Sequence, residues 1–216
     1  MKFFQSKTHK MKKLKDYKGE VKSSNTEEPD LAGYYNYADY QQWTFEGMVE
    51  LINGKIFKMS PAPSTGHQVI SMELCYLIMH HLKVKNCKVF IAPFDVRLSK
   101  FKEDKLIDSV VQPDLCIICD PTKIDEKGCN GTPDMIVEIL SPSTAQSDLD
   151  LKFKLYEENA VKEYWIVQPN DQTVSVFDLI DSKFSLRGIY HRKNIIEVKT
   201  IGLDIDLNEV FPIKDS

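Results

Sequence analysis

Two strongly apolar segments of this chain each contain one acidic residue, and this feature constrains the fold more than any other. Residues 110–119 read VVQPDLCIIC and contain Asp114, and residues 135–140 read MIVEIL and contain Glu138. Apolar runs of this length are typical of strands buried on both faces of a sheet. The sequence therefore predicts two strands buried on both faces of a sheet, which we expect to be neighbours.

The two acids need partners if both lie inside that sheet. An ionised carboxylate in an apolar environment is costly unless it is paired. Two carboxylates about 4 Å apart repel by about 4 kcal/mol at an effective dielectric of about 20, against a typical domain stability of about 5–15 kcal/mol. Either acid alone is more often structural. The pair predicts a site in which one acid is protonated or a divalent cation such as Mg²⁺ lies between them.

The other patterns predict a mixed α/β domain around these strands. Asn53-Gly54 supplies the two positive-φ residues of a tight hairpin turn between two apolar segments. Helical periodicity covers residues 66–83 and 148–159, and residues 37–43 suggest a short helix. Further strands are expected at 87–98, 163–167, 173–179, 183–190 and 195–199, the last three as a closing antiparallel set, and a loop at 120–133.

The helix at 148–159 supplies a third polar group. At 100° per residue, Lys152 lies about 60° from Leu149 on the apolar face, whereas Lys154 lies about 140° away, toward solvent. Lys152 can therefore reach the two acids and hold a water nucleophile or offset negative charge. The alternative is a lysine whose stem covers apolar surface while its amine stays in water.

Two other signals favour structural roles. Cys116 and Cys119 lie three positions apart on a strand, so their thiols point to opposite faces and cannot share a metal. His67 lies near the start of the helix at 66–83 and could approach the acids, but a capping or core role is the more common one.

Composition and charge limit the class of protein and the compartment that we expect. The 216 residues are 42% hydrophobic and 28% charged, as in globular proteins. The five cysteines fit no disulfide framework, and neither a secretory signal nor a membrane-spanning run is present, which predicts a cytoplasmic protein. Residues 1–33 lack periodicity and are expected to be a flexible tail before a domain at 34–216. Residues 1–22 carry a charge of +6 and the rest carries −10. The tail is either a solvated leader or makes weak contacts with nucleic-acid phosphates. The acidic charge of the remaining residues argues against tight DNA binding by charge attraction alone.

Several segments, in the same order, resemble the Uma family, restriction-endonuclease-like proteins of the PD-(D/E)XK nuclease superfamily once classified as a domain of unknown function. The longest is PDMIVEILSPST at 133–144, and the match spans about residues 36–212. Others are ELING at 50–54, QPD at 112–114, VKEYWIV at 161–167, and Lys152 with Tyr156. The resemblance implies a restriction-endonuclease-like fold, a mixed central sheet flanked by helices.

The resemblance also implies roles for particular residues. Asp114 is then the acid of the Pro-Asp half-motif and Glu138 that of the Glu-x-Lys half, and the two bind Mg²⁺ or Mn²⁺. Leu140 stands where the lysine of that half-motif is expected, so Lys152 of the following helix takes its role. Glu50 is either a further catalytic acid facing the metal or a surface residue of the hairpin.

The function implied is metal-dependent hydrolysis of phosphodiesters, by an endonuclease that acts on DNA and that pairs as a homodimer. Two alternatives remain open at this stage. One is a catalytically inactive binding or assembly module on the same fold, because a fold does not fix an activity. The other is a hydrolase of RNA or another phosphodiester.

Overall fold

The computed structural model describes residues 30–43, 48–59, 63–83, 86–99, 103–141 and 146–211. Most of the predicted tail lies outside these ranges, so the boundary at 33/34 stays a prediction. The α-helices are α1 (Tyr37–Tyr40), α2 (Thr65–Leu82), α3 (Gln146–Glu158) and α4 (Leu207–Val210). Of the helices described, none has the length and apolar character needed to span a membrane.

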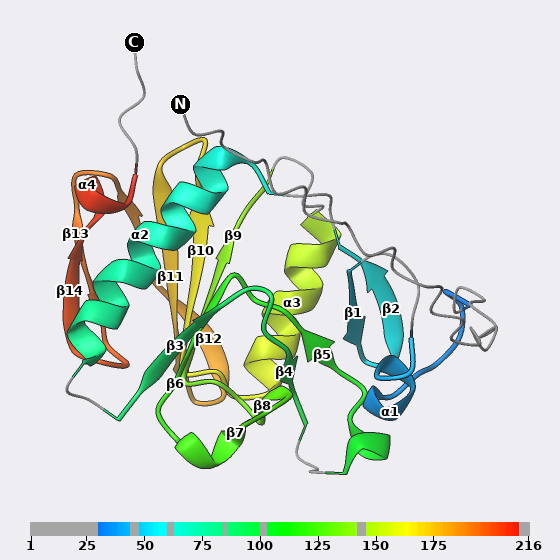
Figure 1. Cartoon of the computed structure of the whole chain (residues 1–216). Helices are drawn as coiled ribbons and strands as arrows, with labels where there is room; N and C mark the ends of the chain where they lie inside the picture. Colours follow the sequence, from blue (N-terminus) through cyan, green and yellow to red (C-terminus); the bar gives the residue numbers. More distant parts are fainter. Residues whose placement is uncertain are drawn as a thin grey trace, which may run out of the picture.

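One six-stranded sheet, which we call the central sheet, has the strand order β12-β11-β10-β9-β6-β3 (Figure 1). Its strands are β3 (Lys88–Ile91), β6 (Leu115–Ile118), β9 (Met135–Ile139), β10 (Glu163–Gln168), β11 (Thr173–Ile180) and β12 (Lys183–His191). β9 and β10 run parallel, joined through α3, and the other pairs are antiparallel. The sheet is therefore mixed, and β6 and β9 are neighbours as predicted.

A second six-stranded sheet, the side sheet, has the order β2-β1-β5-β4-β8-β7. Its strands are β1 (Val49–Ile52), β2 (Lys55–Lys58), β4 (Val96–Arg97), β5 (Val110–Val111), β7 (Ile124–Asp125) and β8 (Gly128–Asn130). The predicted hairpin at Asn53-Gly54 is confirmed, with both residues at positive φ. A separate hairpin of β13 (Ile195–Val198) and β14 (Leu203–Asp206) precedes α4.

Different helices pack against the two faces of the central sheet. Ile70, Leu74 and Ile78 of α2 recur every four residues, and they pack with Val137 of β9 on one face. On the other face, Tyr156 of α3 packs with Ile136 of β9 and also with Ile52 of the side sheet. α3 thus packs against both sheets, and Figure 1 shows it between β9 and the β1–β2 hairpin.

Four predicted elements differ from the structure. The strand predicted at 195–199, as part of one antiparallel set with 173–179 and 183–190, instead pairs with β14 in a separate two-stranded sheet. The predicted strand at 87–98 is divided into β3 and β4, and that at 110–119 into β5 and β6, because the chain passes from one sheet to the other at Pro93 and Pro113. Proline has no N–H to donate to a strand ladder, which favours a break there. Asp114 consequently lies just before β6 and not inside a strand. The predicted loop at 120–133 contains the short hairpin of β7 and β8.

The expectation that the cysteines form no disulfide was wrong. Cys87 and Cys119 are bonded, while Cys75, Cys116 and Cys129 are free thiols. Lys88 of β3 pairs with Ile118 of β6, so the antiparallel register brings Cys87 opposite Cys119. Cys116 and Cys119 do pack into different clusters, as the alternation of side chains requires.

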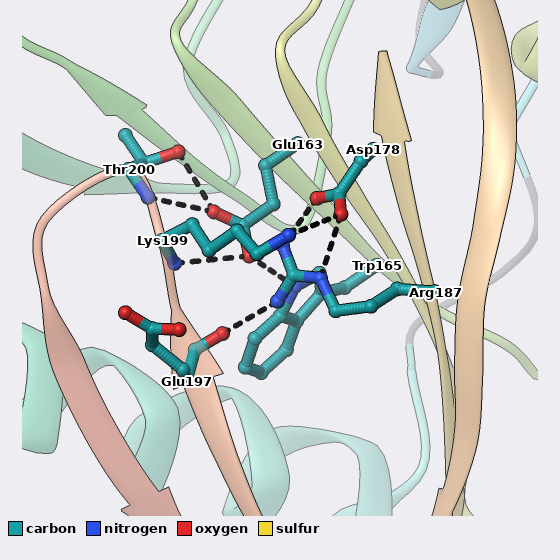
Figure 2. Close-up of polar contacts among 7 residues, drawn as sticks. All are labelled: Glu163, Trp165, Asp178, Arg187, Glu197, Lys199 and Thr200. Carbon is teal, nitrogen blue, oxygen red and sulfur yellow. Dashed lines mark hydrogen bonds and ion pairs between the residues drawn. The ribbon is translucent and has the colours of Figure 1, made fainter. Parts of the chain in front are cut away.

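A buried glutamate ties the β13–β14 hairpin to the central sheet (Figure 2). Glu163 of β10 is 2% exposed, and its carboxylate accepts hydrogen bonds from Trp165 Nε1 and from Arg187 Nη2, both at 3.0 Å. The backbone N–H of Lys199 and both the N–H and hydroxyl of Thr200 donate to the same carboxylate. Arg187 of β12 also pairs with Asp178 of β11. We call these residues the Glu163 cluster.

Candidate active site

Lys152 joins two buried glutamates from different sheets. Its Nζ lies 2.9 Å from Glu50 Oε1 and 3.1 Å from Glu138 Oε1. Glu50 belongs to β1 and Glu138 to β9, and the two residues are 5% and 8% exposed. The backbone N–H of Gln112 also donates to Glu50 Oε1, at 2.9 Å. The amine is therefore part of a buried charged cluster between the two sheets, and its alternative as a solvent-facing lysine is excluded.

The protonation of this cluster is set by burial and by its own charges. Burial raises the pKa of Glu138 to about 7, and Asp114 and Glu50 add to the rise while Lys152 and the Tyr156 hydroxyl oppose it. The Tyr156 hydroxyl donates to Glu138 Oε1 at 2.6 Å. Burial opposes the charged form of Lys152, but the two glutamates hold its pKa above the usual range, so the amine stays protonated. Lys152 can therefore donate hydrogen bonds and offset negative charge, but cannot act as a base.

Asp114 is held at both of its carboxylate oxygens. The N–H of Ile139 donates to Oδ2 at 2.6 Å, and His67 Nε2 lies 3.2 Å from Oδ1. Leu115 pairs with Val137 across the antiparallel β6 and β9, which leaves Asp114 beside Glu138. Burial lowers the pKa of His67, but the hydrogen bond and charge of Asp114 outweigh it, and the net shift is upward. Asp114 and Glu138 are thus adjacent, and different side chains contact them, His67 the first and Lys152 the second.

A cavity of about 370 Å³, which we call the cleft, is lined by these charged groups and by apolar side chains. Glu50, His67, Asp114, Glu138 and Lys152 all line it. The apolar lining includes Met48, Phe57, Met72, Ile91, Leu140 and Leu149. This size and mixture of surfaces are typical of sites for small ligands or parts of larger ones.

The structure brings together all four residues predicted as catalytic, namely Asp114, Glu138, Lys152 and Glu50. Lys154 is exposed, as the helical periodicity predicted. Glu50 is buried and lines the cleft, so the surface alternative does not hold, and its catalytic role stays a prediction. Within the described part of the chain, no three His, Cys, Asp or Glu side chains gather in a way that would hold a metal ion by themselves.

Two contacts were missed. The sequence favoured a capping or core role for His67, but its imidazole reaches Asp114 because α2 begins directly beside the cleft. The helical spacing assigns Tyr156 to the apolar face of the helix, yet its hydroxyl donates a hydrogen bond to Glu138. Its place four residues after Lys152, on the same side of a helix, was the signal that could have revealed it.

Comparisons with known proteins identify a family, a relative and a solved structure that this chain resembles. Residues 37–208 match the model of the Uma2 family, described as "Putative restriction endonuclease". An uncharacterised protein of Synechocystis sp. is 26% identical over 176 residues, covering 80% of this chain and 89% of that protein. A crystal structure from Anabaena variabilis, titled as a "putative nuclease belonging to DUF820", superposes with a TM-score of 0.65 at 20% identity, covering 82% of this chain and 97% of that one. This likeness confirms the predicted α/β nuclease-like fold.

Proposed function

Because the chain belongs to the Uma2 family, we propose that it hydrolyses phosphodiester bonds in a reaction that depends on a divalent cation, with DNA as the substrate. The observation that carries the proposal is the convergence of Glu50, Asp114, Glu138 and Lys152 on one cleft. Burying carboxylates beside one another costs stability, and groups perturbed in this way cluster at functional sites.

The donors in the cleft suit Mg²⁺ or Mn²⁺. Asp114 and Glu138 offer hard carboxylate oxygens, and Mg²⁺ is usually bound by one or two carboxylates together with water and substrate phosphate oxygens. Three acidic side chains, Glu50, Asp114 and Glu138, line the cleft, and Lys58, Lys152 and His67 line it as well. We assign Asp114 and Glu138 to the cation and Glu50 to a supporting position through Lys152. When bound, the ion supplies Lewis acidity toward the phosphodiester.

The side chains of the cleft have distinct parts in the hydrolysis. Water adds to phosphorus and one P–O ester bond breaks, leaving a phosphate monoester and a hydroxyl. Lys152 remains protonated, so it orients the attacking water or stabilises the charge that grows on the phosphoryl oxygens. Glu50 and Glu138 fix the direction of the Lys152 amine. The apolar side chains around the cleft limit the access of bulk water, which strengthens these electrostatic interactions.

We expect purified protein to nick supercoiled plasmid DNA in the presence of Mg²⁺ or Mn²⁺. Asp114→Ala and Glu138→Ala should each lower the nicking rate by at least about 100-fold, because each removes a carboxylate from the cation site. The measurement is gel-resolved conversion of supercoiled to open-circular plasmid, with EDTA as the metal-free control. Asp204→Ala, an exposed acid of β14, is the matched control and should nick at the wild-type rate.

Nicking that persists in both alanine variants would remove Asp114 and Glu138 from the chemistry. Parallel assays on a single-stranded RNA decide between DNA and RNA. A wild-type protein that cuts neither, and that binds no Mn²⁺ by calorimetry in the presence of oligonucleotide, would instead be an inactive module on this fold. A cytoplasmic location and a homodimer remain part of the same proposal.

A further inference from the structure

His67 lies in the wall of the cleft, and its contact with Asp114 has been given no part in the proposed hydrolysis. The residue is 7% exposed, and its Nε2 lies 3.2 Å from Asp114 Oδ1. Its Nδ1 is buried and has no hydrogen-bond partner within the described residues. The two ring nitrogens thus differ, since Nε2 contacts a proposed cation ligand and Nδ1 does not, while the backbone of Ile139 also hydrogen-bonds the imidazole.

The backbone of His67 is held at the start of α2. Ser64 is the N-cap of α2, and its hydroxyl oxygen accepts a hydrogen bond from the His67 N–H at 3.2 Å. α2 is in turn anchored against the central sheet by Ile70 and Leu74. The backbone position from which the ring reaches Asp114 is therefore held at the start of α2.

The opposite side of Asp114 is held by β9. The Ile139 N–H donates to Oδ2, and Ile139 directly follows Glu138 in the chain. Contacts at both oxygens fix the plane of the Asp114 carboxylate relative to Glu138. A carboxylate oxygen that accepts one hydrogen bond keeps further lone-pair capacity for a cation.

We propose that His67 is a positioning residue, which acts through Nε2 to hold the Asp114 carboxylate in the orientation that lets Asp114 and Glu138 bind the divalent cation together. The inference rests on the proposed function, because it assigns a supporting contact to the same cation site. Outer partners of this kind are typically worth about 10- to 100-fold in metal affinity or activity.

Two conservative variants separate the two ring nitrogens. Glutamine places its amide nitrogen close to where Nε2 lies, whereas asparagine places it close to where Nδ1 lies. We expect His67→Asn to raise the Mn²⁺ dissociation constant by about 10- to 100-fold, and His67→Gln to stay within about threefold of the wild type. The measurement is isothermal calorimetry with Mn²⁺ and a short oligonucleotide, together with the Mn²⁺ concentration that half-saturates nicking.

Thermal unfolding without metal distinguishes positioning from a merely structural role. Both variants lose the buried ring, so we expect the Asn and Gln variants to have similar thermal unfolding midpoints. A difference in their Mn²⁺ affinities then reflects which ring nitrogen the amide replaces. Equal Mn²⁺ affinities for the Asn and Gln variants would overturn the inference. Mn²⁺ binding without nicking in the wild type would refute the proposed function alone, because calorimetry still tests His67. A wild type that binds no Mn²⁺ overturns both.

Discussion

Lys152→Met should abolish nicking and destabilise the protein at the same time. The side chain of methionine fills similar space but leaves Glu50 and Glu138 buried with no cation between them. Breaking a buried ion pair by removing one partner typically costs about 3–5 kcal/mol. The nicking rate should fall by at least about 100-fold, as for other groups that stabilise transition-state charge. Denaturant unfolding and plasmid nicking measure the two effects.

The loss of stability in Lys152→Met should also depend on pH. Glu138 has a folded pKa of about 7 against an ordinary value of 4.5, so the folded chain holds the proton more tightly than the unfolded chain. The contribution of Glu138 to stability is therefore present at low pH and is lost as the pH rises from about 4.5 to 7. Without Lys152 the pKa of Glu138 rises further, so the variant's deficit should be larger at pH 8 than at pH 5.

Lys154→Met is the matched control for this experiment. Lys154 lies on the same helix, two residues further on, and is exposed. Its replacement should change the free energy of unfolding by less than about 0.5 kcal/mol, as at most surface positions. A Lys152 variant that matched the Lys154 variant in both stability and nicking would show that the buried amine has no role.

Glu163→Ala should be the most destabilising single change outside the cleft. It removes the acceptor of five hydrogen bonds, from Trp165, Arg187, Lys199 and Thr200 (Figure 2). The buried donors would be left without their partner, and a loss of about 3–5 kcal/mol is typical when one member of a buried charged pair is removed. Since the Glu163 cluster lies outside the cleft, folded protein should keep its nicking rate at low temperature.

Glu197→Ala is the matched control, because Glu197 contacts Arg187 of the Glu163 cluster through its backbone carbonyl. Glu197 contributes its backbone carbonyl, which accepts from Arg187 Nη1 at 2.7 Å, while the residue itself is exposed. The alanine variant keeps that carbonyl and should unfold at nearly the wild-type denaturant concentration. Similar midpoints for Glu163→Ala and Glu197→Ala would contradict a role of the cluster in holding the β13–β14 hairpin.

The choice of Asp114 and Glu138 as site residues could be predicted because it depends on local patterns. Apolar runs identify buried strands, and an acid within or beside such a run is conspicuous. The helical periodicity of 148–159 likewise separated Lys152 from Lys154. These inferences need only the direction of side chains along one element.

Other parts of the site depend on how distant elements pack, which a single sequence does not encode locally. Glu50 meets Lys152 because the side sheet packs against α3, and nothing in the hairpin sequence specifies that. His67 reaches Asp114 because α2 begins at the edge of the cleft. The division of two predicted strands at Pro93 and Pro113 also depends on long-range packing. Each proline predicts a break in the strand, but the local sequence does not specify which sheet the next strand joins.

The central claim is that Asp114 and Glu138 bind one divalent cation in the cleft. Anomalous diffraction at the manganese edge, from crystals grown with Mn²⁺ and a short oligonucleotide, tests it most directly. We expect a peak at about 2.0–2.3 Å from a carboxylate oxygen of each residue, with Lys152 beside it. A map without a peak in the cleft, or with manganese at other acids only, would contradict that claim.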